Sequence, residues 1–208
     1  MTTLMLVRHG ETDYNAEGIF RGRMDVGLNQ KGEQQATSLA EYLSRRRVDV
    51  VYTSPLRRAT RTAEIIAGCH GLQTQVVPEL IDLDCGEWQG LSRHEVKELY
   101  GELYAQWEKT PHLVRLPCGE SLHEVRSRAV DLVHRVAMEN ERDLVFVSHR
   151  VVNKVLICAL LGLDDSHFWN IRLDVCGMTT FSYGKGRFVL TKHNDTSFLG
   201  TMSALGDF

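Results

Sequence analysis

Residues 4–15 read Leu4-Met-Leu-Val-Arg8-His9-Gly10-Glu-Thr-Asp-Tyr-Asn15 and begin with four consecutive apolar side chains. Such a run is long enough for a strand buried on both faces of a sheet. It ends abruptly at a cation, an imidazole and a glycine. Because ligands bind beyond the carboxyl ends of strands in open α/β sheets, this arrangement indicates a site. A strand that runs into an ordinary polar turn is the alternative, and the rest of the chain must decide between them.

The segments that follow alternate between strand and helix patterns. Further strands are predicted at 48–53, 74–78 and 143–148, and a closing hairpin at 176–183 and 187–192. Amphipathic or capped helices are predicted after Asn29, at 56–67, 92–100, 102–109 and 121–140, and at 151–161. Residues 13–28 show little periodicity and are expected to form a long loop. The alternation predicts a three-layer α-β-α sandwich with a mostly parallel central sheet, formed by residues 1–208 as a single domain.

Composition excludes several classes of protein. The chain is 43% hydrophobic with a formal net charge of −3, so no overall basic field points to nucleic acid. Arginines 45–47 fit the end of a helix better than a nucleic-acid patch, because cations are favoured there by the helix dipole. No apolar run has transmembrane length and no leader pattern is found, so we expect a cytoplasmic protein without membrane association. The five cysteines are scattered without Cys-x-x-Cys spacing, which favours reduced thiols over disulfides or zinc.

The predicted strand 143–148 ends in His149 and Arg150, much as the first strand ends in Arg8 and His9. Since first turns after parallel strands converge on one edge, we expect a shared site there. Its members would be Arg8, His9, Asn15, Arg58, Asp82 and His149. Gathered arginines and histidines favour an anion, and the planar guanidinium suits phosphate oxygens. A histidine among them can attack phosphorus to form a phosphohistidine, and Asp82 is the nearest candidate to protonate the leaving oxygen.

Several motifs of the chain resemble the histidine phosphatase superfamily, which has the phosphoglycerate-mutase-like fold. They are Leu-Val-Arg8-His9-Gly10-Glu-Thr, Asn15, Thr53-Ser-Pro-Leu-Arg-Arg58-Ala, Gly86-x-Trp88-x-Gly90, Gly119-Glu-Ser121 and Val-Ser148-His149. The matches span nearly the whole chain in the expected order, and Arg-His-Gly-Glu-Thr is the most specific of them.

The resemblance implies roles at the matching positions. His9 would be phosphorylated, while Arg8, Arg58 and His149 would hold the phosphoryl group. Asn15 would add a hydrogen bond, and Arg21 and Gly22 would contact substrate.

Two positions depart from the family pattern. The family usually has glutamate where this chain has Asp82; aspartate is one methylene shorter, so Asp84 is the alternative acid. The family commonly has glycine where this chain has Arg150. A large cation there puts the local backbone path in question; the side chain either contacts an anionic group of the substrate or points to solvent.

The short segment 90–119, which contains only Arg93 and Arg115, favours a phosphatase over a cofactor-dependent phosphoglycerate mutase, which is the alternative activity. The implied substrate is a small anionic phosphomonoester, resembling phosphoserine, phosphoglycerate or α-ribazole phosphate. Pro111-His112 is similar to the phosphoserine-specific members, but Cys85 stands where those carry histidine. A phosphate-binding protein without catalytic activity is the alternative from another functional class. The presence of all four central site residues, Arg8, His9, Arg58 and His149, disfavours it. We expect no metal and no cofactor, because arginines supply the positive charge, and a homodimer is an open alternative for the assembly.

Overall fold

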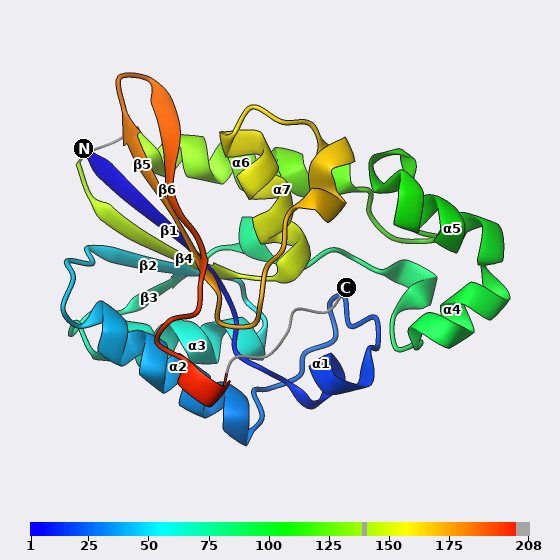
Figure 1. Cartoon of the computed structure of the whole chain (residues 1–208), viewed down its shortest axis with the longest axis horizontal. Coiled ribbons are helices and arrows are strands. Elements are labelled where there is room, and N and C mark those ends of the chain that lie inside the picture. Colours follow the sequence, from blue (N-terminus) through cyan, green and yellow to red (C-terminus); the bar gives the residue numbers. More distant parts are fainter. Residues whose placement is uncertain (139–140, 203–208) are drawn as a thin grey trace.

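The molecule is organised around one six-stranded sheet, seen in the computed structural model, which describes residues 1–138 and 141–202 (Figure 1). The strands run in the order β3-β2-β4-β1-β5-β6 across the sheet. Their bounds are β1 Thr2–Arg8, β2 Val50–Thr53, β3 Thr74–Val76, β4 Asp143–Ser148, β5 Met178–Gly184 and β6 Arg187–Asp195. β1, β2, β3 and β4 are mutually parallel, whereas β5 and β6 form an antiparallel edge. The predicted mostly parallel sheet is therefore confirmed, with the predicted hairpin as its antiparallel part.

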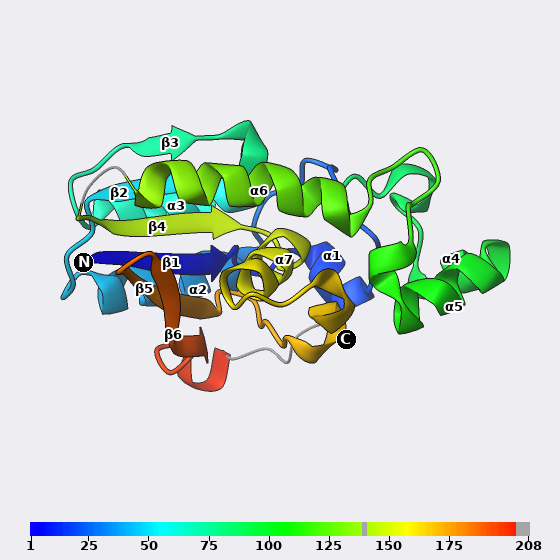
Figure 2. The same cartoon turned by 90° about the horizontal axis from the view of Figure 1, so that it is seen from above.

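Helices cover both faces of this sheet, as Figures 1 and 2 show. The pleat of β1 explains why four apolar residues are consecutive. Leu4 and Leu6 pack with α6 (Leu122–Ala137) and α7 (Arg150–Leu160) on one face. Met5 and Val7 pack with α2 (Gln30–Leu43) and α3 (Arg57–Gly68) on the other. Successive side chains of a strand point to opposite faces, so a strand covered on both sides is apolar throughout.

A helical extension lies beyond the carboxyl ends of the parallel strands (Figure 1). It consists of α4 (Arg93–Leu99) and α5 (Gly101–Lys109). Trp88, which is fully buried, joins this extension to the core: its ring lies 5.1 Å from that of Phe20 and 6.3 Å from that of Trp107. The extension therefore borders the edge of the sheet at which the site is expected.

Helix caps follow the sequence closely. Ser92 with Glu95 and Ser121 with Glu124 form capping boxes at the start of the helices predicted at 92–100 and 121–140, and the Asn29 side chain accepts from Gly32 N to cap α2. These side chains satisfy backbone N–H groups that have no partner within the helix.

The structure corrects the expected long loop at 13–28, which contains the short helix α1 (Asp13–Glu17). Thr12 and Asn15 cap it, with Asn15 Oδ1 accepting from Thr12 N at 2.9 Å. Asparagine in place of the usual glutamate or glutamine hides this capping box from a sequence search. α6 ends at Ala137, before the expected Asn140, and residues 139–140 lie outside the described part.

Short 3-10 turns connect other described elements, namely η1 Pro78–Leu80, η2 Gly86–Trp88, η3 Pro111–Leu113 and η4 Asp165–Asn170, and a further one, η5 Gly200–Met202, follows β6. All five cysteines are free thiols, as expected. No helix within residues 1–138 and 141–202 has both the length and the apolar character needed to cross a bilayer.

Candidate active site

Two neighbouring parallel strands deliver the two histidines. Arg8 of β1 is in register with Ser148 of β4, so His9 and His149 leave the sheet side by side, with ring centroids 5.2 Å apart. The side chains of Arg8, His9, Arg58 and His149 are all buried. The structure therefore brings together the four residues that the sequence motifs singled out.

His9 has a fixed ring orientation. Its Nδ1 lies 2.7 Å from the carbonyl oxygen of Gly10 and donates to it, which leaves Nε2 with the lone pair. Burial, reinforced by the charges of Arg58 and Arg8, holds the pKa of His9 well below its usual 6.5. His9 is thus a neutral imidazole at physiological pH, the form that can act as a nucleophile.

His149 is oriented by Ser54. Its Nε2 lies 2.7 Å from Ser54 Oγ, which also accepts from Leu56 N and therefore has its own proton to give. Burial, then the charges of Arg58 and Arg21, keep the pKa of His149 well below 6.5. A neutral ring that accepts at Nε2 carries its hydrogen on Nδ1. That Nδ1 lies 3.6 Å from Asp82 Oδ2 and has no hydrogen-bond partner among the described residues.

Arg58 is held from several sides in the first turn of α3. Its Nη1 donates to Met24 O at 2.7 Å, and its Nη2 donates to Gly22 O at 2.9 Å and to Asp82 Oδ2 at 3.1 Å. Its Nε is buried without a partner in the described part of the chain, so the guanidinium keeps a donor for a ligand. Burial lowers the pKa of Arg58, and Asp82 opposes that effect.

The other arginines near the start of α3 lie at the surface. Arg57 pairs with Asp25 at 3.2 Å and Arg61 with Glu33 at 2.9 Å. Arg8, by contrast, is fully buried and donates from Nη1 to Leu173 O at 2.8 Å. Two buried guanidiniums and two imidazoles converge on a site that suits an anion the size of phosphate.

The two candidate acids have different surroundings. Asp82 is 8% exposed and touches both Arg58 and His149. Asp84 instead pairs with Arg23 at 3.3 Å and accepts from Gly86 N at 2.9 Å. The structure thus places Asp82, and not Asp84, against Arg58 and His149.

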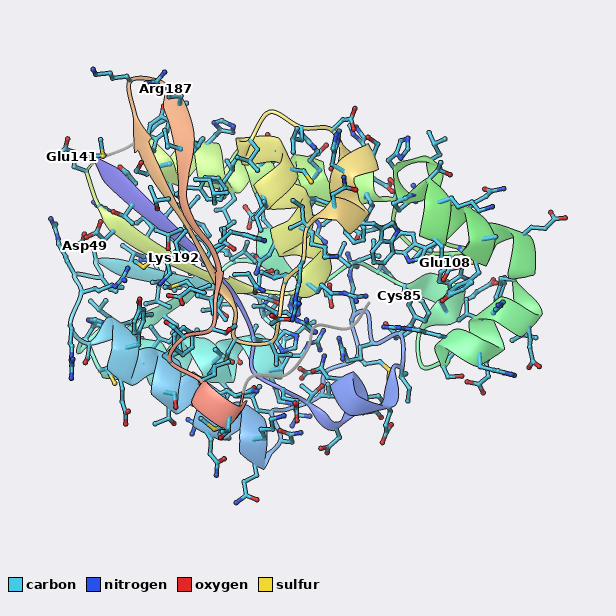
Figure 3. The ribbon with its side chains drawn as sticks, viewed as in Figure 1. Asp49, Cys85, Glu108, Glu141, Arg187 and Lys192 are labelled. Atoms are coloured by element: carbon cyan, nitrogen blue, oxygen red, sulfur yellow. The ribbon has the colours of Figure 1, made fainter. Side chains whose placement is uncertain are left out.

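A cavity of about 230 Å³ adjoins these residues at Asp82. Its aromatic wall is formed by Tyr14, Phe20, Tyr104, Trp107 and Trp169. Its charged groups, besides Asp82, are Arg21, Arg93, Glu108 and Arg150. Figure 3 shows two lining residues, Cys85 and Glu108, on the side of the molecule that carries α4 and α5. Asp82 therefore lies at the boundary between the anion site and the space for the rest of a substrate.

The predicted substrate contacts are only partly at this cavity. Arg21, Gly22 and Arg150 line it, whereas Asn15 does not; Asn15 Oδ1 accepts from the backbone and side chain of Thr12. Arg150 is the first residue of α7, an ordinary helical position that does not need glycine. Its guanidinium carbon lies 6.0 Å from the Trp169 ring centroid, a cation–π arrangement that holds the side chain at the cavity.

Sequence reasoning missed the aromatic wall and Ser54. Ser54 stands at the end of β2, so the rule that placed His9 and His149 could have found it. Trp107 and Trp169 come from separate helical segments, joined by a hydrogen bond from Trp169 Nε1 to Trp107 O at 2.8 Å, and no local pattern indicates that pairing. Across residues 1–138 and 141–202, no group of three or more His, Cys, Asp or Glu side chains is arranged to hold a metal.

The lowered pKa values of His9 and His149 predict a pH-dependent stability. The unfolded chain binds more protons than the folded one below pH 6.5, so the free energy of unfolding should fall as pH drops from about 7 to 5. Each histidine contributes at most about 1.4 kcal/mol per pH unit. Urea unfolding in phosphate-free buffer measures this slope. His149→Gln should reduce the slope, and exposed His94→Gln should not; a flat profile would contradict the assignment.

Comparisons with known proteins point to one family. The sequence model of the histidine phosphatase superfamily (branch 1) matches residues 4–196. Phosphoserine phosphatase 1 of Hydrogenobacter thermophilus is 37% identical over 201 residues, which cover 96% of this chain and 95% of that protein.

Two solved structures show the same relationship. The phosphoserine phosphatase of Entamoeba histolytica, in complex with 3-phosphoglyceric acid, is 31% identical with a TM-score of 0.86, covering 96% of this chain and 100% of that one. Bacillus stearothermophilus YhfR is 30% identical with a TM-score of 0.90, at the same coverage of 96% and 100%. With the family match along almost the entire sequence and the two strand-end histidines between two buried arginines, this chain belongs to the histidine phosphatase superfamily and is a phosphoric monoester hydrolase.

Proposed function

We propose that this chain hydrolyses small anionic phosphomonoesters through a phosphohistidine formed on Nε2 of His9. The observation that carries the proposal is the orientation and protonation of the His9 ring. Its Nδ1 donates to Gly10 O at 2.7 Å, and burial among cations keeps the ring neutral. A neutral, oriented imidazole next to two arginines meets the needs of in-line attack on phosphorus.

In the first step, His9 Nε2 bonds to phosphorus and the bond from phosphorus to the leaving oxygen breaks. Arg8 and Arg58 neutralise the charge on the equatorial oxygens, and Nδ1 of His149 donates a hydrogen bond to one of these oxygens. The phosphoryl group also lies beside the Asp82 carboxyl and competes with it for Arg58. Asp82 then gives its proton to the leaving oxygen and becomes a carboxylate.

In the second step, water attacks the phosphoryl group and the bond from nitrogen to phosphorus breaks. The Asp82 carboxylate takes a proton from that water, which restores the acid, and inorganic phosphate leaves. His9 returns to its neutral form with its lone pair on Nε2. Asp82 thus serves as acid in the first step and as base in the second. Its position between the anion site and the cavity lets it reach both the leaving oxygen and the attacking water.

The leaving group would occupy the aromatic-walled cavity. Arg21 and Arg150 line it, and they favour a second anionic group such as a carboxylate. Substrates of the phosphoserine or phosphoglycerate kind carry that group, and relatives of the chain are named phosphoserine phosphatases. α-Ribazole phosphate is a substrate that tests the contribution of the aromatic wall rather than that of Arg21 and Arg150. Phosphoglycerate mutase activity is the second candidate, and the short segment 90–119 disfavours it. A cytoplasmic location, a homodimer and the lack of a nucleic-acid partner remain predictions of the sequence.

Phosphate release from phosphoserine, 3-phosphoglycerate, α-ribazole phosphate and p-nitrophenyl phosphate tests the proposal. The 3-phosphoglycerate sample is also checked for the 2-isomer with bisphosphoglycerate present. Release without isomerisation supports the phosphatase, whereas rapid isomerisation with little release would make the chain a mutase. A ³²P-labelled substrate, quenched in base to preserve phosphohistidine, should label the wild type on His9.

Arg150→Met is expected to lower kcat/KM for carboxylate-bearing substrates by about tenfold to a hundredfold, mainly through KM, because a charge-assisted contact is removed. The value for p-nitrophenyl phosphate, which has no carboxylate, should change by less than about threefold. Arg57→Met, at an exposed position of α3, is the control. An equal loss on all substrates would show that Arg150 does not read the carboxylate.

Removal of metal ions is expected to leave activity unchanged, because Arg8 and Arg58 supply the charge that a metal supplies in other phosphatases. Phosphate release is measured after dialysis against EDTA and again after addition of Mg²⁺, Mn²⁺ or Zn²⁺. A large loss with EDTA that an added ion restores would contradict this mechanism.

A further inference from the structure

Two arginines outside the anion site bind the backbone of Asp82. Arg128 of α6 donates from Nη2 to Asp82 O at 3.2 Å and from Nη1 to Glu79 O at 2.6 Å. Arg23 donates from Nε to the same Asp82 oxygen at 3.5 Å. The carbonyl of the proposed acid is therefore held between guanidiniums from two distant segments.

Glu120 links these two arginines. Its Oε1 lies 3.0 Å from Arg23 Nη2, and its Oε2 lies 3.2 Å from Arg128 Nη2. Oε2 also accepts from Asp84 N at 3.0 Å, and Glu120 N donates to Asp84 O at 3.0 Å. Glu120 and Arg128 are mostly buried, with 18% and 19% of their side chains exposed, so solvent screens their interaction only partly.

The segment that carries Asp82 needs such support, because residues 81–85 belong to no helix or strand. The tight packing of Gly86 adds to it: a Cβ there would lie 1.9 Å from Pro117 O, and its φ is +51°. An aspartate side chain is also short, so its carboxyl position is set mainly by the backbone. A displacement of the backbone by a fraction of an ångström moves the carboxyl by as much.

We propose that Glu120, together with Arg23 and Arg128, is a positioning cluster that holds Asp82 within reach of the leaving oxygen. Arg58 contacts the carboxyl of Asp82 from inside the site, and the cluster fixes its carbonyl from outside. This inference rests on the proposed function, in which Asp82 is the acid. The hydrogen bonds of Arg23 and Arg128 to Asp82 O are the route by which we expect the cluster to act on catalysis. The charge of Arg128 also helps to lower the pKa of His149, and p-nitrophenyl phosphate, whose hydrolysis needs His149 but not the acid, reports that separate effect.

The leaving group distinguishes positioning from general stability. An alkoxide is a poor leaving group and needs the proton that Asp82 gives, whereas p-nitrophenolate departs without one. Misplacing the acid should therefore slow the first and spare the second. A merely loosened fold would slow both substrates alike, because both need Arg8, His9, Arg58 and His149.

The experiment compares kcat/KM for the alkyl phosphomonoester that the wild type hydrolyses fastest with kcat/KM for p-nitrophenyl phosphate. The variants are Glu120→Gln and Arg128→Met, with Arg128→Lys as the conservative exchange that keeps the charge. Arg126→Met is the matched control: Arg126 also lies on α6, pairs with Asp165 at 2.8 Å and donates to Leu163 O at 2.9 Å. Asp82→Asn gives the reference signature of a lost acid.

Glu120→Gln and Arg128→Met should each lower the alkyl value by about tenfold to a hundredfold and the p-nitrophenyl value by less than about threefold. Arg128→Lys should recover part of the loss, and Arg126→Met should leave the ratio of the two values unchanged. Equal losses on both substrates, or no loss on either, would overturn the positioning cluster. If Asp82→Asn itself shows no dependence on the leaving group, the assignment of the acid fails; if it does and Glu120→Gln does not, only the cluster fails.

Discussion

His9→Ala is expected to reduce phosphate release by at least about 10⁴-fold and to abolish labelling by a ³²P-phosphomonoester. The reason is that the neutral Nε2 of His9 is the proposed nucleophile, and no other group shares its position. His149 cannot replace it, because its Nε2 faces Ser54 Oγ at 2.7 Å and its Nδ1 carries the hydrogen. The loss should therefore appear in kcat for every substrate, whatever its leaving group.

Exposed His94 is the matched control, and His94→Ala should keep full activity. The exchange removes a buried imidazole and leaves a cavity in its place. Thermal unfolding is therefore measured to verify that the His9 variant is folded. Substantial turnover by a folded His9→Ala protein would rule out the phosphohistidine route. Absence of labelling in the wild type with every phosphomonoester tried would instead favour a phosphate-binding protein.

Asp82→Asn is expected to lower kcat/KM for alkyl phosphomonoesters by about 10²- to 10⁴-fold, because an amide cannot give the proton that the leaving alkoxide needs. The loss with p-nitrophenyl phosphate should be much smaller. The exchange keeps the size of the side chain and its place beside Arg58 and His149, so the phosphate-binding contacts remain.

Asp84→Asn is the comparison that decides between the two candidate acids. Asp84 contacts Arg23 and Gly86 N rather than the anion site, so its loss should cost less than about tenfold and show little dependence on the leaving group. The reverse order of effects would assign the acid to Asp84. It would require the 81–85 segment to rearrange when substrate binds.

Much of the site follows from the sequence because its parts are tied to strand ends. A run of four apolar residues that stops at Arg8 and His9, and a second strand that stops at His149, determine two neighbouring positions once the strands are parallel. Arg58 lies in the first turn of its own helix, where the dipole disfavours a cation, and its side chain is nevertheless buried, as a functional cation would be. The capping boxes at Ser92 and Ser121 determined where two helices begin.

The short helix α1 and the placement of Asn15 were not predictable in the same way. Asn15 Oδ1 accepts from Thr12 N and caps α1. This contact depends on a local turn without apolar periodicity, so the sequence pattern does not indicate it. The path at Arg150, questioned because a glycine is usual there, turns out to be the ordinary first turn of a helix. Local backbone geometry decided both positions.

By itself, the sequence determined the strand and helix alternation and the motifs that carry chemistry, since hydrophobic period, caps and strand ends are local properties of the chain. Only the tertiary structure decided which aspartate faces the phosphate site, which aromatic rings wall the cavity, and that Glu120 links Arg23 to Arg128 behind Asp82. These contacts join residues separated by tens of positions, and their geometry depends on how α5, α6 and η4 pack around the edge of the sheet. A pattern read along the chain carries no information about such distances, because they are set by packing between segments and not by any one of them.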